Sequence, residues 1–423
     1  MNIKPTEFLR QLFDAAVDAA YPKISQMPLP KPVKGKTVVI GAGKAAASMA
    51  KVVEDNFTGD LSGIVITRYE HGLTLKNVRV VEAGHPVPDE EGAHAAKEIF
   101  DLVQDLGEDD QLICLISGGG SSLLSLPADG VSLTSKKLIN KALLASGATI
   151  SEINTVRKKL SAIKGGKLAG AAYPAKMSTY MISDVPGDDP SVIASGPTIP
   201  DLTTVADAKN ILARYTIEIP SDVASYLNSG LAEPIGADHP AFGLCENHMI
   251  SIPQDALVAA AEIARQHSIE PVIFGDSIEG EAKDVARVFA GITRQVLGYD
   301  QPAATPCVLL SGGETTVTVS KNAGPTGRGG RNAEFLLAYA ETLGPESRVY
   351  AIAADTDGID GTEDNAGALF DPTTHERALG ASLDLTDYLS RHDAYNFFAK
   401  LDDLVVTGPT RTNVNDFRAI LIL

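Results

Sequence analysis

Residues 37–50 read TVVIGAGKAAASMA and contain the first decisive sign of the fold. Thr37–Ile40 is a run of β-branched residues, which favours a strand, and the glycine turn after it leads into an alanine-rich helix. The same order of strand, glycine turn and helix recurs at residues 111–124, which read QLICLISGGGSSLL. Apolar strands that alternate with helices in this way are typical of a parallel sheet covered on both faces.

The alternation continues through the first half of the chain and restarts after the Pro- and Gly-rich stretch 233–243, EPIGADHPAFG. Further strands are expected at 63–67, 77–82, 179–183, 248–252, 271–274, 349–353, 404–406 and 419–423, with a strand pair at 307–310 and 315–319. Helices are expected at 5–20, 136–144, 153–169, 255–267, 280–296 and 332–342.

The 423 residues exceed one ordinary domain, since a domain holds about 150 residues. We predict an α/β protein with an N-terminal domain at 1–235, built on a doubly wound, Rossmann-like parallel sheet. A smaller C-terminal α/β domain is expected at 236–423. A C-terminal tail that returns to the first domain stays open as an alternative.

Composition excludes several classes of protein. The chain carries 36 basic and 54 acidic side chains, a formal net charge of −18, which argues against a nucleic-acid binder. Its three cysteines are too scattered for a disulfide framework or a zinc site and suit a reducing cytosol. Residues 5–20 have the spacing of an amphipathic surface helix, and no apolar run approaches the ~20 residues that span a bilayer. We expect a cytoplasmic enzyme without a membrane partner, whose few cations gather wherever it binds an anion.

The turn after the first strand contains Gly41, Gly43 and Lys44 and fits the G-x-G-x-x-A pattern of a phosphate-binding turn. A lysine at the start of a helix is unfavourable unless an anion binds there, because it adds to the positive end of the helix dipole. A lysine that extends into solvent, and a turn that serves only helix–strand packing, are the alternatives.

A second turn has three consecutive glycines between serines, which exposes backbone N–H groups suited to a phosphate or a carboxylate. Its candidate binding residues are Ser117, Gly118, Gly119, Gly120 and Ser121. A basic run follows at 154–170, NTVRKKLSAIKGGKLAG, and on one helix its Arg157, Lys164 and Lys167 would share a face. That run is either an anion site or a solvated basic face.

Two acidic clusters follow strands, at the sheet edge where ligands bind in open α/β folds. The first holds Asp184, Asp188 and Asp189, and the second holds Asp355 and Asp357. Such carboxylates suit Mg²⁺ ligation or a general base, whereas turn formation is the structural alternative.

The glycine-rich stretch 324–332, GPTGRGGRN, places Arg328 and Arg331 just before an expected helix, which repeats the arrangement of Lys44. His71 and His85 lie near expected strand ends. For both histidines, contact with a ligand and a place in the core or a turn are equally open.

Together these motifs resemble those of the glycerate 2-kinases of the MOFRL type. The resemblance rests on GAGKAAASMA, GHPVPDEEG, ISGGGSSLL, NTVRKKLSAIKGGKLA, SDVPGDDPSVIASGPT, LSGGETTVTV, GRGGRNAE, AADTDGIDGTEDNAGA and TGPTRTNVND, which cover almost the whole chain in order. It implies two α/β domains around a deep cleft. It also implies ATP-dependent phosphorylation of the C2 hydroxyl of D-glycerate to 2-phosphoglycerate, with a divalent metal such as Mg²⁺. A homodimer stays open.

The family's important lysine corresponds to Lys44 and its important arginine to Arg331, and we expect both to neutralise phosphate charge. Asp189 is the candidate to accept the proton of the substrate hydroxyl, with Asp184 or Asp188 as alternatives. Further expected roles are metal binding by Asp184, Asp355 and Asp357, phosphate or carboxylate binding by the two glycine turns, and substrate binding by Arg157, Lys164, Asn413 and Asn415.

Members of this family often carry the label hydroxypyruvate reductase, so an NAD(P)H-dependent reductase is the alternative activity. It would use the 41–46 turn for a dinucleotide and Glu70 for the ribose. The lysine inside that turn, and the lack of an obvious His–carboxylate pair in the sequence, favour the kinase. A third alternative is a non-catalytic sensor of a nucleotide or sugar phosphate, which would need the glycine turns but not the acidic clusters.

Overall fold

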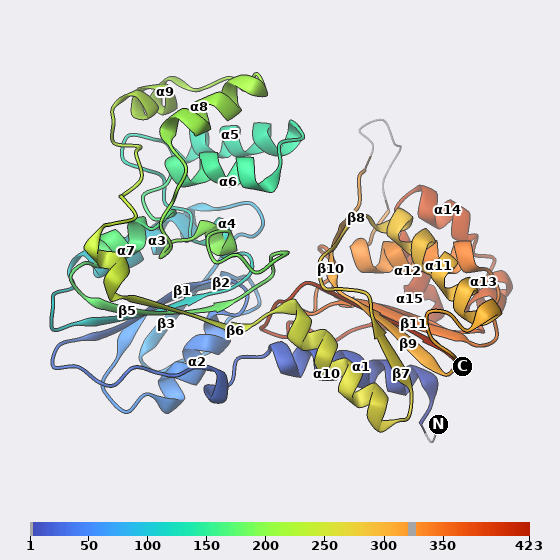
Figure 1. Ribbon diagram of the computed structural model, residues 1–423. Coiled ribbons are helices and arrows are strands. Elements are labelled where there is room, and N and C mark those ends of the chain that lie inside the picture. The colour runs from blue at the N-terminus through green and yellow to red at the C-terminus, as the bar shows by residue number, and fades with distance from the viewer. Residues whose placement is uncertain (1–2, 320–326) are drawn as a thin grey trace. The chain divides into compact units, whose positions relative to one another are not determined.

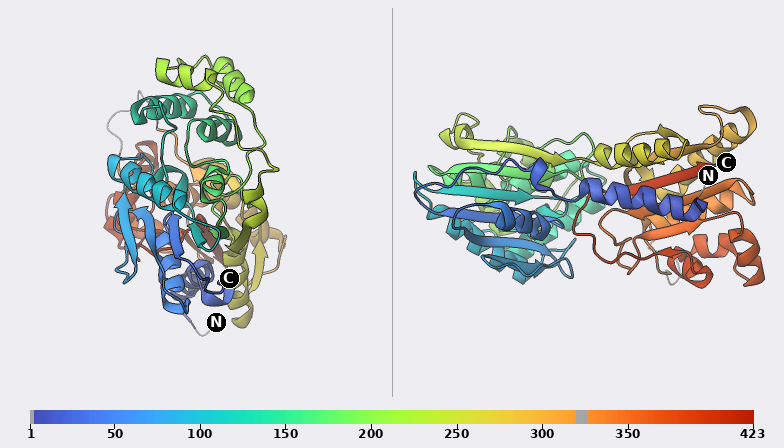
Figure 2. Two further views of the ribbon diagram at one scale, coloured as in Figure 1. Left: turned by 90° about the vertical axis from the view of Figure 1, so that its left-hand side faces the viewer. Right: turned by 90° about the horizontal axis from the view of Figure 1, so that it is seen from below.

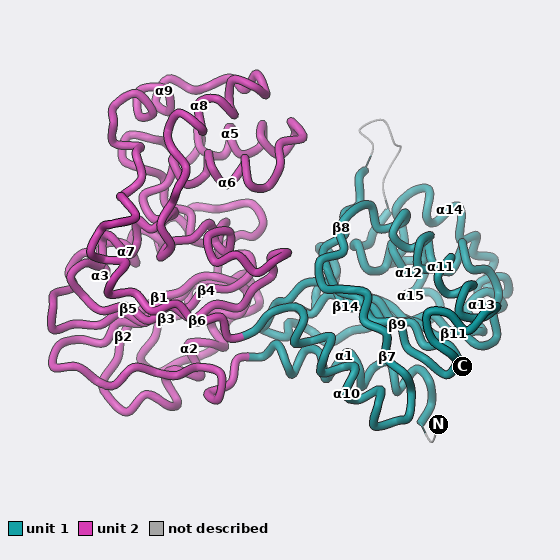
Figure 3. Tube along the Cα trace, in the orientation of Figure 1, with its two compact units in different colours: residues 1–21, 251–423 teal, residues 22–250 magenta. Residues whose placement is uncertain are grey.

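The computed structural model describes residues 3–319 and 327–423 (Figure 1). These residues form two compact units, which Figure 3 draws in different colours. Unit 2 comprises residues 22–250, and unit 1 combines the residues before Pro22 with residues 251–423. The sequence predicts a boundary at 235/236, whereas these units meet in the chain at 250/251, and the first helix joins the C-terminal part.

Unit 2 is built on a six-stranded sheet with the order β3-β2-β1-β4-β5-β6. Its strands are β1 (Thr37–Ala42), β2 (Ser62–Arg68), β3 (Val78–Ala83), β4 (Gln111–Ile116), β5 (Lys176–Ile182) and β6 (Cys245–Ser251). Strands β1 to β5 pair in parallel, and the order reverses between β1 and β4. Figure 1 shows α2 (Ala46–Asn56) on one face, and α3 (Glu90–Gln104) and α7 (Lys167–Ala172) on the other. The predicted doubly wound parallel sheet is confirmed.

A second group of helices in unit 2 packs around its own apolar core. It consists of α5 (Leu133–Ala145), α6 (Ile150–Lys159), α8 (Val205–Arg214) and α9 (Ser221–Asn228). The predicted single helix at 153–169 is wrong, because α6 ends at Lys159 and α7 begins at Lys167. Gly165 and Gly166 both take left-handed backbone angles, with φ of 64° and 80°, and therefore interrupt the helix.

Unit 1 contains a mixed sheet with the order β13-β12-β11-β14-β9-β7. Its strands are β7 (Glu270–Ile273), β9 (Cys307–Ser311), β11 (Val349–Asp355), β12 (Gly367–Phe370), β13 (Leu404–Val405) and β14 (Asp416–Ile422). Strand β14 lies between β11 and β9 and is antiparallel to both, so the C-terminal tail is a central strand of unit 1.

The predicted strand pair at 307–310 and 315–319 is wrong. Strand β9 pairs with β14 and β7, whereas β10 (Gly313–Thr316) pairs with β8 (Ile278–Glu281) in a separate two-stranded sheet. Gly313 lies where the chain turns from β9 into β10, and its φ is 110°. A Cβ on Gly313 would lie 2.1 Å from the carbonyl oxygen of Ile278. Only glycine permits this approach of β10 to β8.

Helices cover both faces of the unit 1 sheet, with α1 (Pro5–Ala20) and α10 (Pro253–Gln266) on one face and α11 (Ala282–Tyr299) and α12 (Arg331–Leu343) on the other (Figure 1). The remaining helices of unit 1 are α13 (Thr374–Gly380), α14 (Leu385–Ser390) and α15 (Ala394–Leu401). Helices α1 and α10 lie side by side although they are far apart in the sequence (Figure 2). No helix among the described residues is long and apolar enough to cross a membrane.

Candidate functional site

The two glycine turns of unit 2 lie next to each other, because they follow the neighbouring strands β1 and β4, where the strand order reverses. The backbone N–H of Lys44 donates to the carbonyl oxygen of Gly118 at 2.9 Å. The backbone N–H of Ala45 donates to Ser117 Oγ at 3.0 Å. Ligands bind at this position in doubly wound folds. The structure therefore brings together the two predicted phosphate-binding turns.

Glycine is required in both turns. A Cβ on Gly43 would lie 2.1 Å from Ser117 Oγ, so the two loops could not approach as they do. A Cβ on Gly119 would lie 2.9 Å from the ring of His85 and 3.5 Å from Lys44 Cγ. The glycines thus allow the side chains of Lys44 and His85 to lie against the second turn.

The basic run, which begins in the last turn of α6, is mostly buried rather than solvated. Lys159 Nζ donates to Asp201 Oδ2 at 2.7 Å, and Lys158 Nζ lies 3.7 Å from Asp201 Oδ1. Lys167 Nζ donates to the carbonyl oxygen of Ser161 at 2.7 Å and contacts the last carbonyls of α6. These three lysines have structural partners. The predicted common helix face is wrong, because Lys164 lies in the break between α6 and α7.

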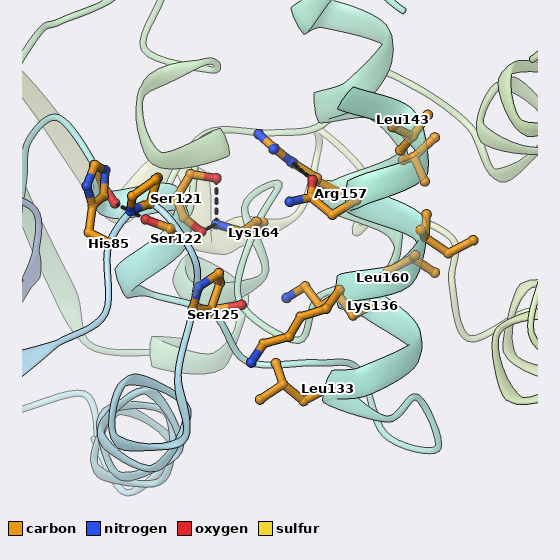
Figure 4. A pocket seen from close by; sticks show the side chains of 17 residues that line it. His85, Ser121, Ser122, Ser125, Leu133, Lys136, Leu143, Arg157, Leu160 and Lys164 are labelled. Atoms are coloured by element: carbon orange, nitrogen blue, oxygen red, sulfur yellow. Dashed lines mark hydrogen bonds between the residues drawn. The ribbon is translucent and has the colours of Figure 1, made fainter. Parts of the chain in front are cut away.

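Arg157 and Lys164 instead line a cavity of about 220 Å³ within unit 2, shown in Figure 4. Its wall comes from the segment after β3, α4 (Gly120–Leu123), α5, α6 and the segment after α6. Its residues are His85, Pro86, Pro88, Gly119, Ser121, Ser122, Ser125, Leu133, Lys136, Lys137, Ile139, Asn140, Leu143, Val156, Arg157, Leu160 and Lys164. Among these described lining residues there is no Asp or Glu.

Lys164 is almost completely buried, with 1% of its surface exposed. Its ammonium donates to the carbonyl oxygen of Ser121 at 2.7 Å, to Ser121 Oγ at 3.1 Å and to the carbonyl oxygen of Ala194 at 3.3 Å. Burial lowers the pKa of Lys164 well below its usual value, and the positive charges of Lys136 and Arg157 lower it further. This lysine therefore gains from any anion that enters the cavity.

Lys136 is the cavity residue that sequence reasoning missed. It is 8% exposed, and burial followed by repulsion from Arg157 and Lys167 lowers its pKa to about 7. The signal was present in the sequence, because Lys136 shares one helix face with the buried Ile139 and Leu143. A lysine on an apolar stripe indicates either a buried partner or a ligand.

Arg157 is fixed by a neighbouring helix. Its Nε donates to Asn140 Oδ1 at 2.6 Å, which joins α6 to α5. Burial lowers the pKa of its guanidinium, yet an arginine stays charged at physiological pH. Arg157 is therefore a permanent positive charge on the wall of the cavity.

The acidic cluster after β5 contains no buried pair of carboxylates. Asp189 is exposed, and its Oδ1 accepts the backbone N–H of Ser191 at 2.8 Å, which is turn chemistry. Asp184 is half-buried, and Asp188 takes a left-handed φ of 54°.

Arg331 starts α12 in unit 1 and is surrounded by acids. Its Nε donates to Asp416 Oδ1 at 2.6 Å, its Nη1 to Glu314 at 2.6 Å and its Nη2 to Asp355 at 2.9 Å. Burial would lower the pKa of this guanidinium, but the three carboxylates hold it well above the usual value. The other arginine of this stretch, Arg328, pairs with Glu363 and lies over the ring of Tyr395. The first residues of the stretch, 324–326, lie outside the described residues.

A buried polar network supports Arg331. Asp416 also accepts from Asn332 Nδ2 at 2.8 Å and pairs with Arg418, which is 1% exposed. Burial would raise the pKa of Asp416, but Arg331 and Arg418 lower it. Asp360 accepts the backbone N–H groups of Asn332 and Ala333 at 2.9 and 2.8 Å and so caps α12.

Asp355 and Asp357 form a buried turn after β11. Asp355 Oδ1 accepts the N–H of Asp357 at 3.0 Å, and Asp357 Oδ1 accepts the N–H of Ile359 at 2.8 Å. Asn413 and Asn415 are both buried. The carbonyl oxygen of Asn415 accepts the backbone N–H of Thr356 at 3.0 Å, which places this segment beside the turn.

The sequence suggests Asp184, Asp355 and Asp357 as metal ligands. Within residues 3–319 and 327–423, no group of three or more His, Cys, Asp or Glu side chains is arranged to hold an ion. Mg²⁺ is often held by one or two carboxylates together with substrate phosphates, and Asp355 and Asp357 offer oxygens suited to that arrangement.

The chain matches two family models. Residues 8–228 match the Domain of unknown function (DUF4147), and residues 307–416 match the MOFRL family. The chain is 52% identical over 423 residues to an Agrobacterium vitis protein that bears the provisional name hydroxypyruvate reductase, covering all of this chain and 95% of that protein.

Two further similarities concern Thermotoga maritima. The chain is 37% identical to its D-glycerate 2-kinase, over 98% of this chain and 97% of that one. A solved structure of a Thermotoga maritima glycerate kinase matches with a TM-score of 0.85 and 36% identity, over 99% of this chain and 98% of that one. The chain therefore belongs to the glycerate kinase family, with a DUF4147 domain in its N-terminal half and a MOFRL domain in its C-terminal half.

Proposed function

We propose that this protein phosphorylates the C2 hydroxyl of D-glycerate to give 2-phosphoglycerate, with ATP as the phosphate donor and Mg²⁺ as the accompanying ion. The observation that carries the proposal is the cavity of unit 2, which gathers cations in a chain of net charge −18 and lies beside the two glycine turns. Full-length similarity to a D-glycerate 2-kinase supports the same reaction.

Lys44 and Arg331 are the proposed groups that neutralise the charge of the transferred phosphoryl group. Only one of the three carboxylate contacts of Arg331 is exposed enough for a phosphate group to replace it. Its partners Asp355 and Asp416 are buried, with 5% and 0% of their side chains exposed, whereas the side chain of Glu314 is 47% exposed. A phosphate group that binds Arg331 would therefore replace the contact with Glu314.

The remaining roles follow the same chemistry. Asp189, with Asp184 or Asp188 as alternatives, is proposed to accept the proton of the glycerate hydroxyl. Mg²⁺, held by phosphate oxygens together with Asp184, Asp355 or Asp357, would supply additional positive charge to the nucleotide. Asn413 and Asn415 are proposed to position the substrate through the turn at Asp355–Asp357.

The test is to incubate the protein with D-glycerate, ATP and Mg²⁺ and to measure ADP and the 2- and 3-phosphoglycerate isomers separately. We expect ADP and 2-phosphoglycerate in equal amounts. Lys44→Ala and Arg331→Ala should each lower kcat roughly 100-fold or more. Lys51→Ala, which removes an exposed lysine of α2, the helix that follows the Lys44 turn, is the control and should change little.

The name of the Agrobacterium vitis relative motivates a parallel assay with hydroxypyruvate and NADH. Consumption of NADH without formation of ADP from glycerate would replace the kinase by the reductase. Near-normal phosphorylation by Lys44→Ala or Arg331→Ala would leave the reaction in place but contradict the proposed roles of these residues.

A further inference from the structure

The cavity of unit 2 has an unusual charge composition. Lys136 from α5, Arg157 from α6 and Lys164 from the segment after α6 all line it, and His85 adds a titratable ring (Figure 4). No acidic side chain is found among its described lining residues. The nearby lysines that carry structural ion pairs, Lys158 and Lys159, bind Asp201 instead. Lys136, Arg157 and Lys164 have neutral partners instead: Lys136 Nζ donates to the carbonyl oxygen of Leu126 at 3.3 Å, and the bonds of Lys164 to Ser121 and Ala194 use its three N–H groups. An anion from outside would therefore meet Lys136 and the Arg157 guanidinium first.

The size of the cavity limits that anion. Its volume of about 220 Å³ lies below the roughly 300–1,000 Å³ of pockets that hold drug-sized ligands. A nucleoside triphosphate would need more space and would bring several negative charges. A three-carbon acid fits the volume and brings one negative charge.

The neutral part of the lining also suits a hydroxy acid. Hydroxyl groups of Ser121 and Ser122 lie on α4 at one side, and Ser121 Oγ already joins Lys164 at 3.1 Å and Ser195 Oγ at 2.9 Å. The opposite side is apolar, formed by residues such as Leu133, Leu143 and Leu160. The Ser122 hydroxyl donates to the carbonyl oxygen of Gly119 at 3.0 Å, so a short carbon chain with hydroxyl groups meets acceptor oxygens on one side and apolar contact on the other.

We propose that this cavity is the acceptor site and binds a small 2-hydroxy monocarboxylate, with Lys136 as a specificity-determining residue that holds the carboxylate together with Arg157. A bond from Lys164 to the carboxylate would replace one of its bonds to Ser121 or Ala194. The proposal rests on the proposed kinase function and deepens it, since it assigns the acceptor to unit 2 and adds Lys136 to the residues that bind it. Asn140 acts as a positioning residue, because it orients the Arg157 guanidinium through the 2.6 Å bond to Nε.

The test is isothermal titration of the full chain with D-glycerate, with inorganic phosphate and with ATP as separate probes. Lys136→Met keeps the apolar stem and removes the charge. It should raise the Kd of D-glycerate roughly 10-fold or more, as expected for the loss of a hydrogen bond to a charged group, and leave the Kd of ATP within about twofold. The matched control is Lys141→Met, which removes an exposed lysine from the same helix.

Arg157→Gln provides a second variant in case Lys136→Met does not fold, which thermal unfolding followed by circular dichroism would show. Weakened binding of ATP or phosphate with unchanged binding of D-glycerate would overturn the proposal. So would a wild-type protein that binds no D-glycerate either alone or with ADP present. Both results are read from binding, so failure of the kinase assay can be distinguished from failure of this assignment.

Discussion

Lys136 lies on the buried face of α5, where the neighbouring positions Ile139 and Leu143 are apolar. A lysine there is costly unless it loses its proton or meets an anion. Its pKa is lowered to about 7, first by burial and then by repulsion from Arg157 and Lys167. The side chain is therefore balanced between its neutral and charged forms near physiological pH.

A bound carboxylate favours the charged form and therefore raises the pKa of Lys136. Below about pH 7 the lysine is already charged in the free protein, so this group adds no pH dependence to D-glycerate binding. Above that pH a proton must be taken up on binding, and the Kd should rise by up to about tenfold per pH unit. Titrations from pH 6.5 to 9, in buffers of different ionisation enthalpy, measure both the Kd and the proton uptake.

Lys136→Met serves as the control for this pH dependence and should flatten the part of the profile that comes from Lys136. The pKa of Lys164 is also lowered, so some proton uptake should remain in the variant. A wild-type Kd that stays constant or falls between pH 7 and 9 would contradict the proposed carboxylate site.

At the scale of elements, the strands could be predicted because their apolar runs are short and end in glycine. Strand β4 has the predicted bounds, Gln111–Ile116, and all six of its residues are buried. The prediction failed at 153–169 because periodicity does not reveal the left-handed backbone of Gly165 and Gly166. It also failed for β9 and β10, since pairing depends on distant partners such as Ile278.

The site was partly visible in the sequence for the same reason. A glycine turn after a strand is a local signal that the sequence shows directly. The sequence could therefore indicate that the 41–46 and 117–122 turns lie close to each other. Lys136 could not be ranked above other lysines, because its burial comes from the packing of α5 against α6. Asp416 and Arg418 lie on β14, far in sequence from Arg331, and no local pattern links them.

The start of α12 allows a test at the scale of one element. Asp360→Ala leaves the buried N–H groups of Asn332 and Ala333 without their acceptor and should cost about 2 kcal/mol or more of stability. Hydrogen exchange of the α12 amides should report the loss. The control is Asp384→Ala at the exposed start of α14, where Asp384 accepts from Thr386 and the expected cost is about 0.5–1 kcal/mol. Equal costs at the two helices would contradict the role of burial.

At the scale of the whole molecule, the two units differ in how the chain builds them. Unit 2 is continuous from 22 to 250 and contains two apolar cores and the described residues that line the cavity. Unit 1 needs α1, which contacts α10, β11 and β14. Six side chains of α1 are fully buried, and four of them are large: Phe8, Leu9, Leu12 and Phe13.

Burial of these four side chains contributes about 6–12 kcal/mol, at about 1.5–3 kcal/mol each, which is comparable with the whole stability of about 5–15 kcal/mol of a typical domain. A fragment of residues 251–423 should therefore remain unfolded, and addition of residues 1–21 as a peptide should restore structure. The ring contact of Phe13 with Phe417, with centroids 5.9 Å apart, provides a specific probe, because Phe13→Ala in the peptide should weaken the rescue.

A fragment of residues 22–250 should fold by itself, since two apolar cores and the described lining of the cavity lie entirely within this range. It should still bind D-glycerate, because Lys136, Arg157 and Lys164 all lie within it, and with a higher Kd than the full chain, because it lacks Asn413 and Asn415. It should not phosphorylate D-glycerate, because Arg331 belongs to unit 1. Circular dichroism, titration with D-glycerate and the ADP assay measure the three properties separately. A folded fragment that fails to bind D-glycerate would show that the acceptor site needs unit 1, and a fragment that forms ADP from ATP and D-glycerate would remove Arg331 from the mechanism.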